Sequence, residues 1–161
     1  MAKYSIGLDF GTNSVRALVV NCANGNEAGE AVVAYPSGIE GILLDPSDHN
    51  LARQSPLDYT VAMEECLRAA LRCASEKYPD VAQNVIGIGV DTTGSTPIPV
   101  DRANRPMCLN PKYKSNLNAC AWLWKDHTAF AEAARITELA RSMRPHYLAK
   151  CGGVYSSEWY W

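Results

Sequence analysis

Residues 7–16 read Gly-Leu-Asp-Phe-Gly-Thr-Asn-Ser-Val-Arg, and this stretch decides the fold. A run of β-branched and aromatic residues from Tyr4 to Phe10 leads into it, and a second apolar run from Val15 to Asn21 continues from it. Small polar residues between two such runs predict a β-hairpin. We expect the hairpin to place the carboxylate of Asp9 at the end of its first strand, close to the turn.

The same hairpin has the groups that a phosphate-binding turn needs. Asp9 suits a Mg²⁺ ion held mostly through water molecules, and Gly11 permits close approach of the backbone to a ligand. The amides of residues 12–14 can point into the concavity of the turn and donate to phosphate oxygens, while Arg16 adds a charge contact. A plain hairpin with a polar turn is the alternative. The position on the first strand, before a hydrophobic second strand, favours phosphate binding.

The chain after the hairpin continues the same sheet and then changes to a helix. A turn at 21–26 and a strand at 30–35 predict an antiparallel meander of three strands. Residues 36–54 are rich in turn-forming residues and are expected to be a loop. A helix is predicted over 55–79, with serine as its cap, proline at its first position and a second proline ending it.

The second half of the chain predicts a mixed α/β domain. Residues 85–90 are almost all apolar, which fits a strand buried on both faces, and residues 98–101 extend as another strand. A long loop is expected over 102–118, and a second helix follows Asp126 and closes at Pro145. The order βββ-α-β-α is that of the ribonuclease-H-like fold of actin-like ATPases, with a mixed sheet, an N-terminal antiparallel β-meander and flanking helices.

Composition narrows the class of protein. The 161 residues suffice for a compact domain, with 47% hydrophobic and 20% charged residues. A net charge of −2 without a basic stripe speaks against nucleic acid as a partner. No apolar run reaches membrane-spanning length and no signal peptide is evident, so we expect a cytoplasmic protein with no membrane partner. The six cysteines contain no C-x-x-C pair, which predicts free thiols.

Four segments together resemble the FGGY family of carbohydrate kinases. The likeness covers essentially the whole chain, although such kinases are several-fold longer. It implies an actin-like ATPase fold, phosphoryl transfer from ATP with Mg²⁺, and ribulose as the small-molecule partner. The segments are the hairpin, Ile88-Gly89-Val90-Asp91-Thr92-Thr93-Gly94, Trp122-Leu123-Trp124-Lys125-Asp126-His127-Thr128 and Cys151-Gly152-Gly153-Val154-Tyr155-Ser156-Ser157-Glu158-Trp159.

The resemblance assigns a role to each residue that matches the family's motifs. Asp9 would be the carboxylate associated with Mg²⁺. The residues implied to contact the nucleotide phosphates are Gly11, Thr12, Asn13 and Arg16, and Asn13 departs from the threonine of some relatives. The implied substrate residues are Gly94, Ser95, Trp124, Asp126 and Glu158.

Most of these substrate residues also fit a purely structural role. Asp126 could simply cap the following helix, and Trp124 could belong to the core. Glu158 could be an acid in the first turn of a helix. Gly94 and Ser95 replace larger sugar-contacting side chains of relatives, so they leave room for a bulkier pentulose or a different recognition of hydroxyls.

The resemblance also implies that part of the kinase site is missing. We find no second hairpin of the Asp-x-Gly-Gly type, and the family's catalytic Asp would fall beyond Trp161. The aromatic end at 156–161 resembles a helix that stops after one turn. We therefore expect residues 1–161 to be the N-terminal part of a kinase, inactive alone. A kinase for another ketose or polyol (xylulose, glycerol) and a non-enzymatic actin-like nucleotide-binding module stay open, as does a homo-oligomer.

Overall fold

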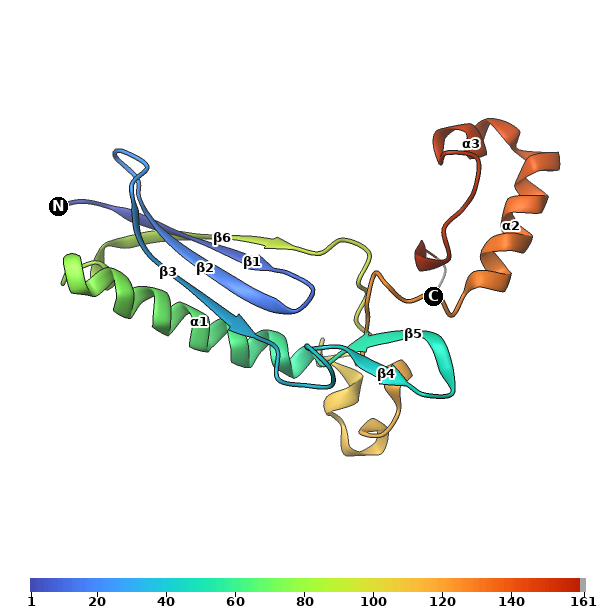
Figure 1. The fold of residues 1–161 in the computed structure, drawn as a ribbon, viewed down its shortest axis with the longest axis horizontal. Coiled ribbons are helices and arrows are strands. Elements are labelled where there is room, and N and C mark those ends of the chain that lie inside the picture. The colour runs from blue at the N-terminus through green and yellow to red at the C-terminus, as the bar shows by residue number, and fades with distance from the viewer. Residues whose placement is uncertain (160–161) are drawn as a thin grey trace. The chain divides into compact units, whose positions relative to one another are not determined.

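The computed structural model describes residues 1–159, so Tyr160 and Trp161 of the expected aromatic end lie outside the described residues. The chain divides into two compact units, and each is described by itself (Figure 1). Unit 1 consists of residues 1–42 and 55–93, and unit 2 consists of residues 43–54 and the chain from residue 94 onward.

Unit 1 is built on a four-stranded mixed sheet. Its strands are β1 (Tyr4–Phe10), β2 (Ser14–Asn21), β3 (Glu27–Ala34) and β6 (Val85–Thr92), in the order β3-β2-β1-β6. The first three are antiparallel neighbours, and β6 runs parallel to β1. The predicted meander is confirmed, although β3 begins three residues earlier than expected. The turn before it is closed tightly by a 2.9 Å hydrogen bond from the Asn21 amide to the Asn26 carbonyl.

One long helix, α1 (Pro56–Lys77), covers one face of this sheet (Figure 1). The helix begins as predicted, with Ser55 at the cap position and proline next, but the Ser55 side chain makes no capping hydrogen bond. Small residues form the buried centre of the helix, and larger ones such as Tyr59 flank them. A Cβ atom on Gly29 of β3 would lie 2.5 Å from the Ala74 nitrogen, so glycine permits this close packing. The small buried residues are Ala62, Cys66, Ala70 and Ala74.

The prediction that β6 is buried on both faces is wrong for the described structure. Ile86, Ile88 and Val90 are 63%, 54% and 63% exposed. Two features explain this exposure: β6 is the edge strand of the sheet, and α1 packs against β3 and β2 at the other side. An apolar run of this length indicated a strand correctly, but it did not indicate what covers the strand.

Unit 2 contains a small antiparallel sheet that sequence analysis missed. Its strands are β4 (Leu43–Asp45), β5 (Asp48–Gln54) and β7 (Ala121–Trp122), in the order β4-β5-β7. The expected loop over 36–54 is therefore wrong from residue 43 onward. The sequence did not indicate this strand because two of its buried residues, Arg53 and Gln54, are polar.

The rest of unit 2 is helical or irregular. α2 (Phe130–Met143) and α3 (Pro145–Lys150) follow one another, so Pro145 closes the predicted helix and begins a short new one. The strand expected at 98–101 is absent from the described residues there, where only a single bridge joins Val100 and Pro106. Short 3₁₀ turns interrupt the long loop and the chain elsewhere, at Ala82–Asn84, Met107–Leu109, Pro111–Tyr113, Leu117–Ala119 and Ser157–Trp159.

Two predictions from composition can be compared with the structure. All six cysteines are free, as expected. Among residues 1–159, no helix combines the length and the apolar character needed to cross a membrane.

Candidate functional site

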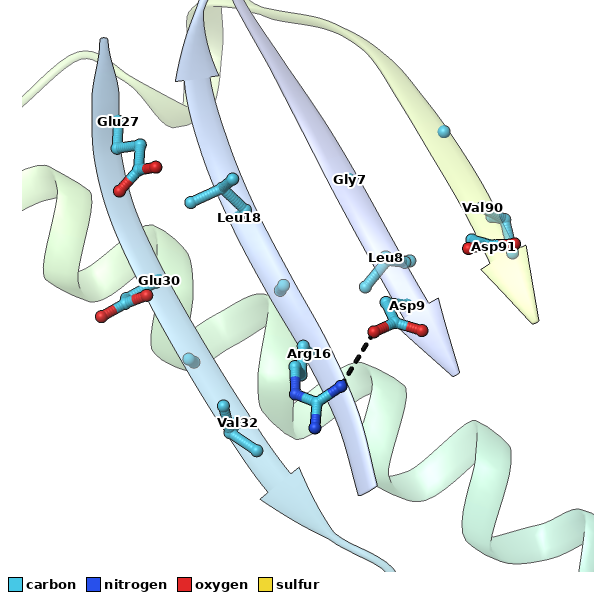
Figure 2. A pocket seen from close by; sticks show the side chains of 13 residues that line it. Gly7, Leu8, Asp9, Arg16, Leu18, Glu27, Glu30, Val32, Val90 and Asp91 are labelled. Carbon is cyan, nitrogen blue, oxygen red and sulfur yellow. Dashed lines mark hydrogen bonds and ion pairs between the residues drawn. The ribbon is translucent and has the colours of Figure 1, made fainter. Parts of the chain in front are cut away.

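The β1–β2 hairpin places a carboxylate and a guanidinium side by side. Asp9 and Arg16 are direct partners in the antiparallel register, and an Arg16 Nη1 to Asp9 Oδ2 distance of 2.9 Å joins them. Figure 2 shows both side chains on the sheet face that α1 does not cover. Since both side chains are about half exposed, this ion pair contributes little to stability, and both groups can exchange it for a ligand.

The turn between the two strands is narrow and tied down. The Gly11 amide donates to the Ser14 carbonyl at 2.9 Å. A Cβ atom on Gly11 would lie 3.3 Å from that carbonyl oxygen and 3.8 Å from Arg16 Nη1, so a side chain there would fill the space beside the guanidinium. Thr12 lies at the tip. Glycine at position 11 therefore keeps this space free of a side chain, and the phosphate-binding role of the turn stays a prediction.

Asn13 connects this turn to the loop after β3. Its side-chain Nδ2 donates to the Glu40 carbonyl at 2.7 Å, and its own carbonyl accepts from the Tyr35 amide at 2.9 Å. Burial, followed by the charges of Asp9 and Asp58, raises the pKa of Tyr35 to about 12. The side chain of Asn13 thus has a structural partner in addition to the ligand role predicted for it.

A hollow of 590 Å³ lies on the same sheet face as Asp9 and Arg16 (Figure 2). Asp91 of β6 is the direct register partner of Asp9, because the two strands are parallel and end together. Glu27 and Glu30 also line the hollow, so acids outnumber the single arginine. Sequence analysis named Asp91 only within a segment that carries the family resemblance and gave it no role in the site. The signal that could have found it is an aspartate at the carboxyl end of each of two apolar strands.

The donor set around Asp9 fits a hydrated magnesium ion better than a protein cage. Within residues 1–159 there is no group of three or more His, Cys, Asp or Glu side chains that could hold a metal. Mg²⁺ near phosphates keeps several of its waters and uses one or two carboxylates. Asp9, with Asp91 beside it, matches that requirement.

Trp124 is presented by a second turn, in unit 2. The Asp126 amide donates to the Leu123 carbonyl at 2.8 Å, which makes Trp124 and Lys125 the two central residues of a β-turn. Leu123 and Asp126 are both 0% exposed, whereas Trp124 is 39% exposed, with the Lys125 ammonium 5.5 Å from its ring centroid. The partly exposed ring of Trp124 thus protrudes from a turn whose first and last residues are buried.

Asp126 is the buried residue that ends this turn. Its Oδ2 accepts from the Ala52 amide at 2.8 Å and pairs with Arg53, while its Oδ1 accepts from the Thr128 amide and hydroxyl at 3.1 and 2.5 Å. The alternative that Asp126 caps the following helix is wrong, because α2 begins at Phe130 with Ala129 at the cap position. In this structure the carboxylate faces protein groups on both of its oxygens.

Glu158 lies close to His127, the residue that follows the Trp124 turn. His127 Nδ1 lies 2.7 Å from Ser157 Oγ and 3.7 Å from Glu158 Oε2, and the Ser156 hydroxyl donates to Glu158 at 2.5 Å. Residues Ser157–Trp159 form a 3₁₀ helix with Glu158 in its first turn, which agrees with the structural alternative for this residue, and the remainder of the expected helix lies outside the described residues. Glu158 is held by its neighbours and is partly exposed.

Gly94 and Ser95 follow β6 and are exposed. A Cβ atom on Gly94 would meet nothing within 4 Å, which agrees with the expected open space. Ser95 adopts φ = 55°, a left-handed conformation that is uncommon outside glycine. The structure therefore groups the predicted phosphate residues in unit 1 and the predicted substrate residues in unit 2.

Known proteins resemble the chain in both sequence and fold. No protein-family model matches it. The ribulokinase of Vibrio parahaemolyticus is 44% identical over 160 residues, covering 99% of the chain and 28% of that protein. The ribulokinase of Halalkalibacterium halodurans is 38% identical over 161 residues, again 28% of its length. The chain is similar to ribulokinases over almost its whole length.

Solved structures share the fold of this chain. A xylulose kinase from Brucella ovis has a TM-score of 0.67 at 23% identity, with 95% of the chain and 26% of that protein covered. The glycerol kinase of Plasmodium falciparum, solved with ADP, has a TM-score of 0.63 at 16% identity, covering 98% and 27%. The expected actin-like ATPase fold, with its mixed α/β sheet, is thereby confirmed. The chain spans little more than a quarter of the length of these relatives.

Proposed function

We propose that this chain is the N-terminal part of an ATP-dependent kinase that phosphorylates ribulose to ribulose 5-phosphate. The observation that supports this most is the 44% identity to a ribulokinase across 99% of the chain. The proposal places the catalytic base and the adenosine site in parts of the kinase outside these 161 residues. The chain then contributes one wall of the phosphate site and part of the sugar site.

In this proposal the β1–β2 hairpin holds the nucleotide phosphates. Asp9 orients a hydrated Mg²⁺ ion, and Arg16 leaves its exposed pair with Asp9 to contact a phosphate oxygen. Gly11 keeps the backbone accessible, and Thr12 and Asn13 provide donors at the tip. Mg²⁺, when bound with ATP, neutralises the charge that develops during phosphoryl transfer. The excess of carboxylates around the hollow favours a cation between protein and phosphate.

The residues proposed to contact the sugar belong to unit 2. The exposed indole of Trp124 packs on the C–H face of the sugar and leaves its hydroxyls to polar groups. Gly94 and Ser95 leave space for a pentulose, and Glu158 accepts from a hydroxyl. Asp126 contributes indirectly, because its carboxylate binds Ala52 and Arg53 and so holds the Trp124 turn in place.

A chimera tests this function. The segment of the V. parahaemolyticus ribulokinase that matches this chain is replaced by these 161 residues, and ADP release is followed with L-ribulose, D-ribulose, D-xylulose and glycerol. We expect the highest kcat/KM for a ribulose. A preference for glycerol or xylulose would overturn the assignment of the sugar, and a folded chimera without turnover on any of the four would overturn the kinase assignment.

A further inference from the structure

Strand β5 holds the Trp124 turn at both of its ends. The Leu123 amide donates to the Ala52 carbonyl at 3.1 Å, and the Ala52 amide donates to Asp126 Oδ2 at 2.8 Å. One residue of β5 thus fixes the first and the last residue of the turn. The direction in which Trp124 protrudes depends on this attachment, because Leu123 and Asp126 are fully buried.

The next residue of β5, Arg53, joins the same turn from its other side. Arg53 is 1% exposed and directly opposite Trp122 in the β5–β7 register. Its guanidinium carbon lies 3.8 Å from the centroid of the Trp122 ring, and the group pairs with the carboxylate of Asp126. Its Nη2 also donates to Asn118 Oδ1 at 3.1 Å. Arg53 therefore connects the strand that enters the turn to the residue that ends it.

The chemistry of arginine explains why this residue type is suited to the position. A planar guanidinium stacks on an aromatic ring and binds a carboxylate at the same time, which a lysine ammonium does not do. Burial lowers the pKa of Arg53 to about 10, so the group is still charged at neutral pH. A buried ion pair is often no more stabilising than an apolar pair of the same size. What the pair adds is a fixed geometry.

We propose that Arg53 is a positioning residue that sets the orientation of Trp124 toward its ligand. The inference rests on the proposed function for the identity of that ligand, a ketose. The positioning itself rests on the stacking with Trp122 and the pairing with Asp126. Arg53 is 71 positions from Trp124 in the sequence.

The orientation of Trp124 can be measured without a ligand. The chain is labelled with 5-fluorotryptophan, and its ¹⁹F resonances are assigned with Trp→Phe variants. Two variants change Arg53 without leaving a lone buried charge: Arg53→Lys, and Arg53→Met combined with Asp126→Leu. In both we expect the Trp124 resonance to move toward its position in denaturant while the circular dichroism is retained. Arg68→Met, on the exposed face of α1, is the control and should leave the resonance in place.

An unmoved Trp124 resonance in either folded variant overturns the proposal. The chimera then gives the functional measurement: Arg53→Lys should raise KM for L-ribulose about tenfold, the effect of losing one aromatic packing contact, with kcat changed much less. Equal losses in kcat at unchanged KM would contradict a positioning role. Trp124→Ala distinguishes the sugar role of Trp124 from the positioning role of Arg53. An unchanged KM for L-ribulose in this variant would rule out the sugar role, and the ¹⁹F comparison would still decide whether Arg53 orients Trp124.

Discussion

The turn after β1 and the turn after β7 both present candidate ligand groups, but different parts of the chain hold them. In the first, the Gly11–Ser14 hydrogen bond and the Asp9–Arg16 pair join residues at most seven positions apart. In the second, Asp126 is held by Ala52, which is 74 positions away. The first turn is partly exposed at the end of a sheet, and the second has buried residues at its ends, one of them charged. The comparison teaches that a short local motif can present a polar site, whereas the protruding ring of Trp124 is supported by residues far away in the sequence.

The largest effect is expected from removing the carboxylate of Asp126, which pairs with the buried Arg53. Asp126→Ala leaves Arg53 buried without its partner, which should lower the free energy of unfolding of unit 2 by about 3–5 kcal/mol. Tryptophan fluorescence in a denaturant titration reports this unit, because all four tryptophans lie after residue 121. Arg105→Ala breaks an exposed pair with Asp101, and its midpoint should stay close to that of the unchanged chain. Equal shifts for the two variants would contradict a buried ion pair.

The stability of unit 1 should be lowered by a substitution that adds side-chain volume between α1 and the sheet, and not by the removal of a charge. Gly29→Val places a side chain where the Ala74 nitrogen is 2.5 Å away, and overpacking of this kind costs about 1–3 kcal/mol. Gly89→Val is the matched control, since nothing lies within 4 Å of a Cβ atom there. The measurement is the denaturation midpoint followed by the helical circular dichroism signal. If Gly89→Val were the more destabilising variant, the packing of α1 on β3 would be wrong.

A smaller effect is expected from the one side chain that ties the first turn to another segment. Asn13→Asp replaces the amide donor to Glu40 with a group that cannot donate, and the loss of one exposed hydrogen bond should cost about 0.5–1.5 kcal/mol. Amide hydrogen exchange at Tyr35, whose N–H donates to the Asn13 carbonyl, follows the change locally. Unchanged protection at Tyr35 would show that this tie does not hold the turn.

The last effect is absent at neutral pH and concerns alkaline pH. The pKa of Tyr35 is raised in the folded protein to about 12, and burial raises the pKa of Tyr59 as well. An unfolded tyrosine loses its proton near pH 10, so unit 1 should be most stable below pH 10 and should lose stability between pH 10 and 12. Tyr35→Phe should make this loss shallower, with Tyr59 accounting for the remainder. A pH dependence identical to that of the unchanged chain would contradict the burial of the Tyr35 hydroxyl.

The same difference between local and distant support decides what could be predicted from the sequence. The hairpin, the meander and α1 were predicted, because turn residues and helical periodicity lie within a few positions of what they determine. β5 was missed, because its buried residues Arg53 and Gln54 have the pattern of a loop. The exposure of β6 and the support of Asp126 depend on neighbours that no local pattern encodes. Ligand roles for Asp9 and Trp124 stay predictions.

The central claim, that the β1–β2 hairpin binds the phosphates of a magnesium nucleotide in a ribulose kinase, is tested most directly by Asp9→Asn in the chimera. Turnover of L-ribulose is measured by ADP release across a range of Mg²⁺ concentrations, with Asp45→Asn, a partly exposed aspartate of β4, as the control. We expect kcat to fall about a hundredfold for Asp9→Asn, as when a group that stabilises transition-state charge is removed, with the fold unchanged. Asp45→Asn should retain full activity. A folded Asp9→Asn chimera with undiminished kcat and an unchanged Mg²⁺ dependence would contradict the claim.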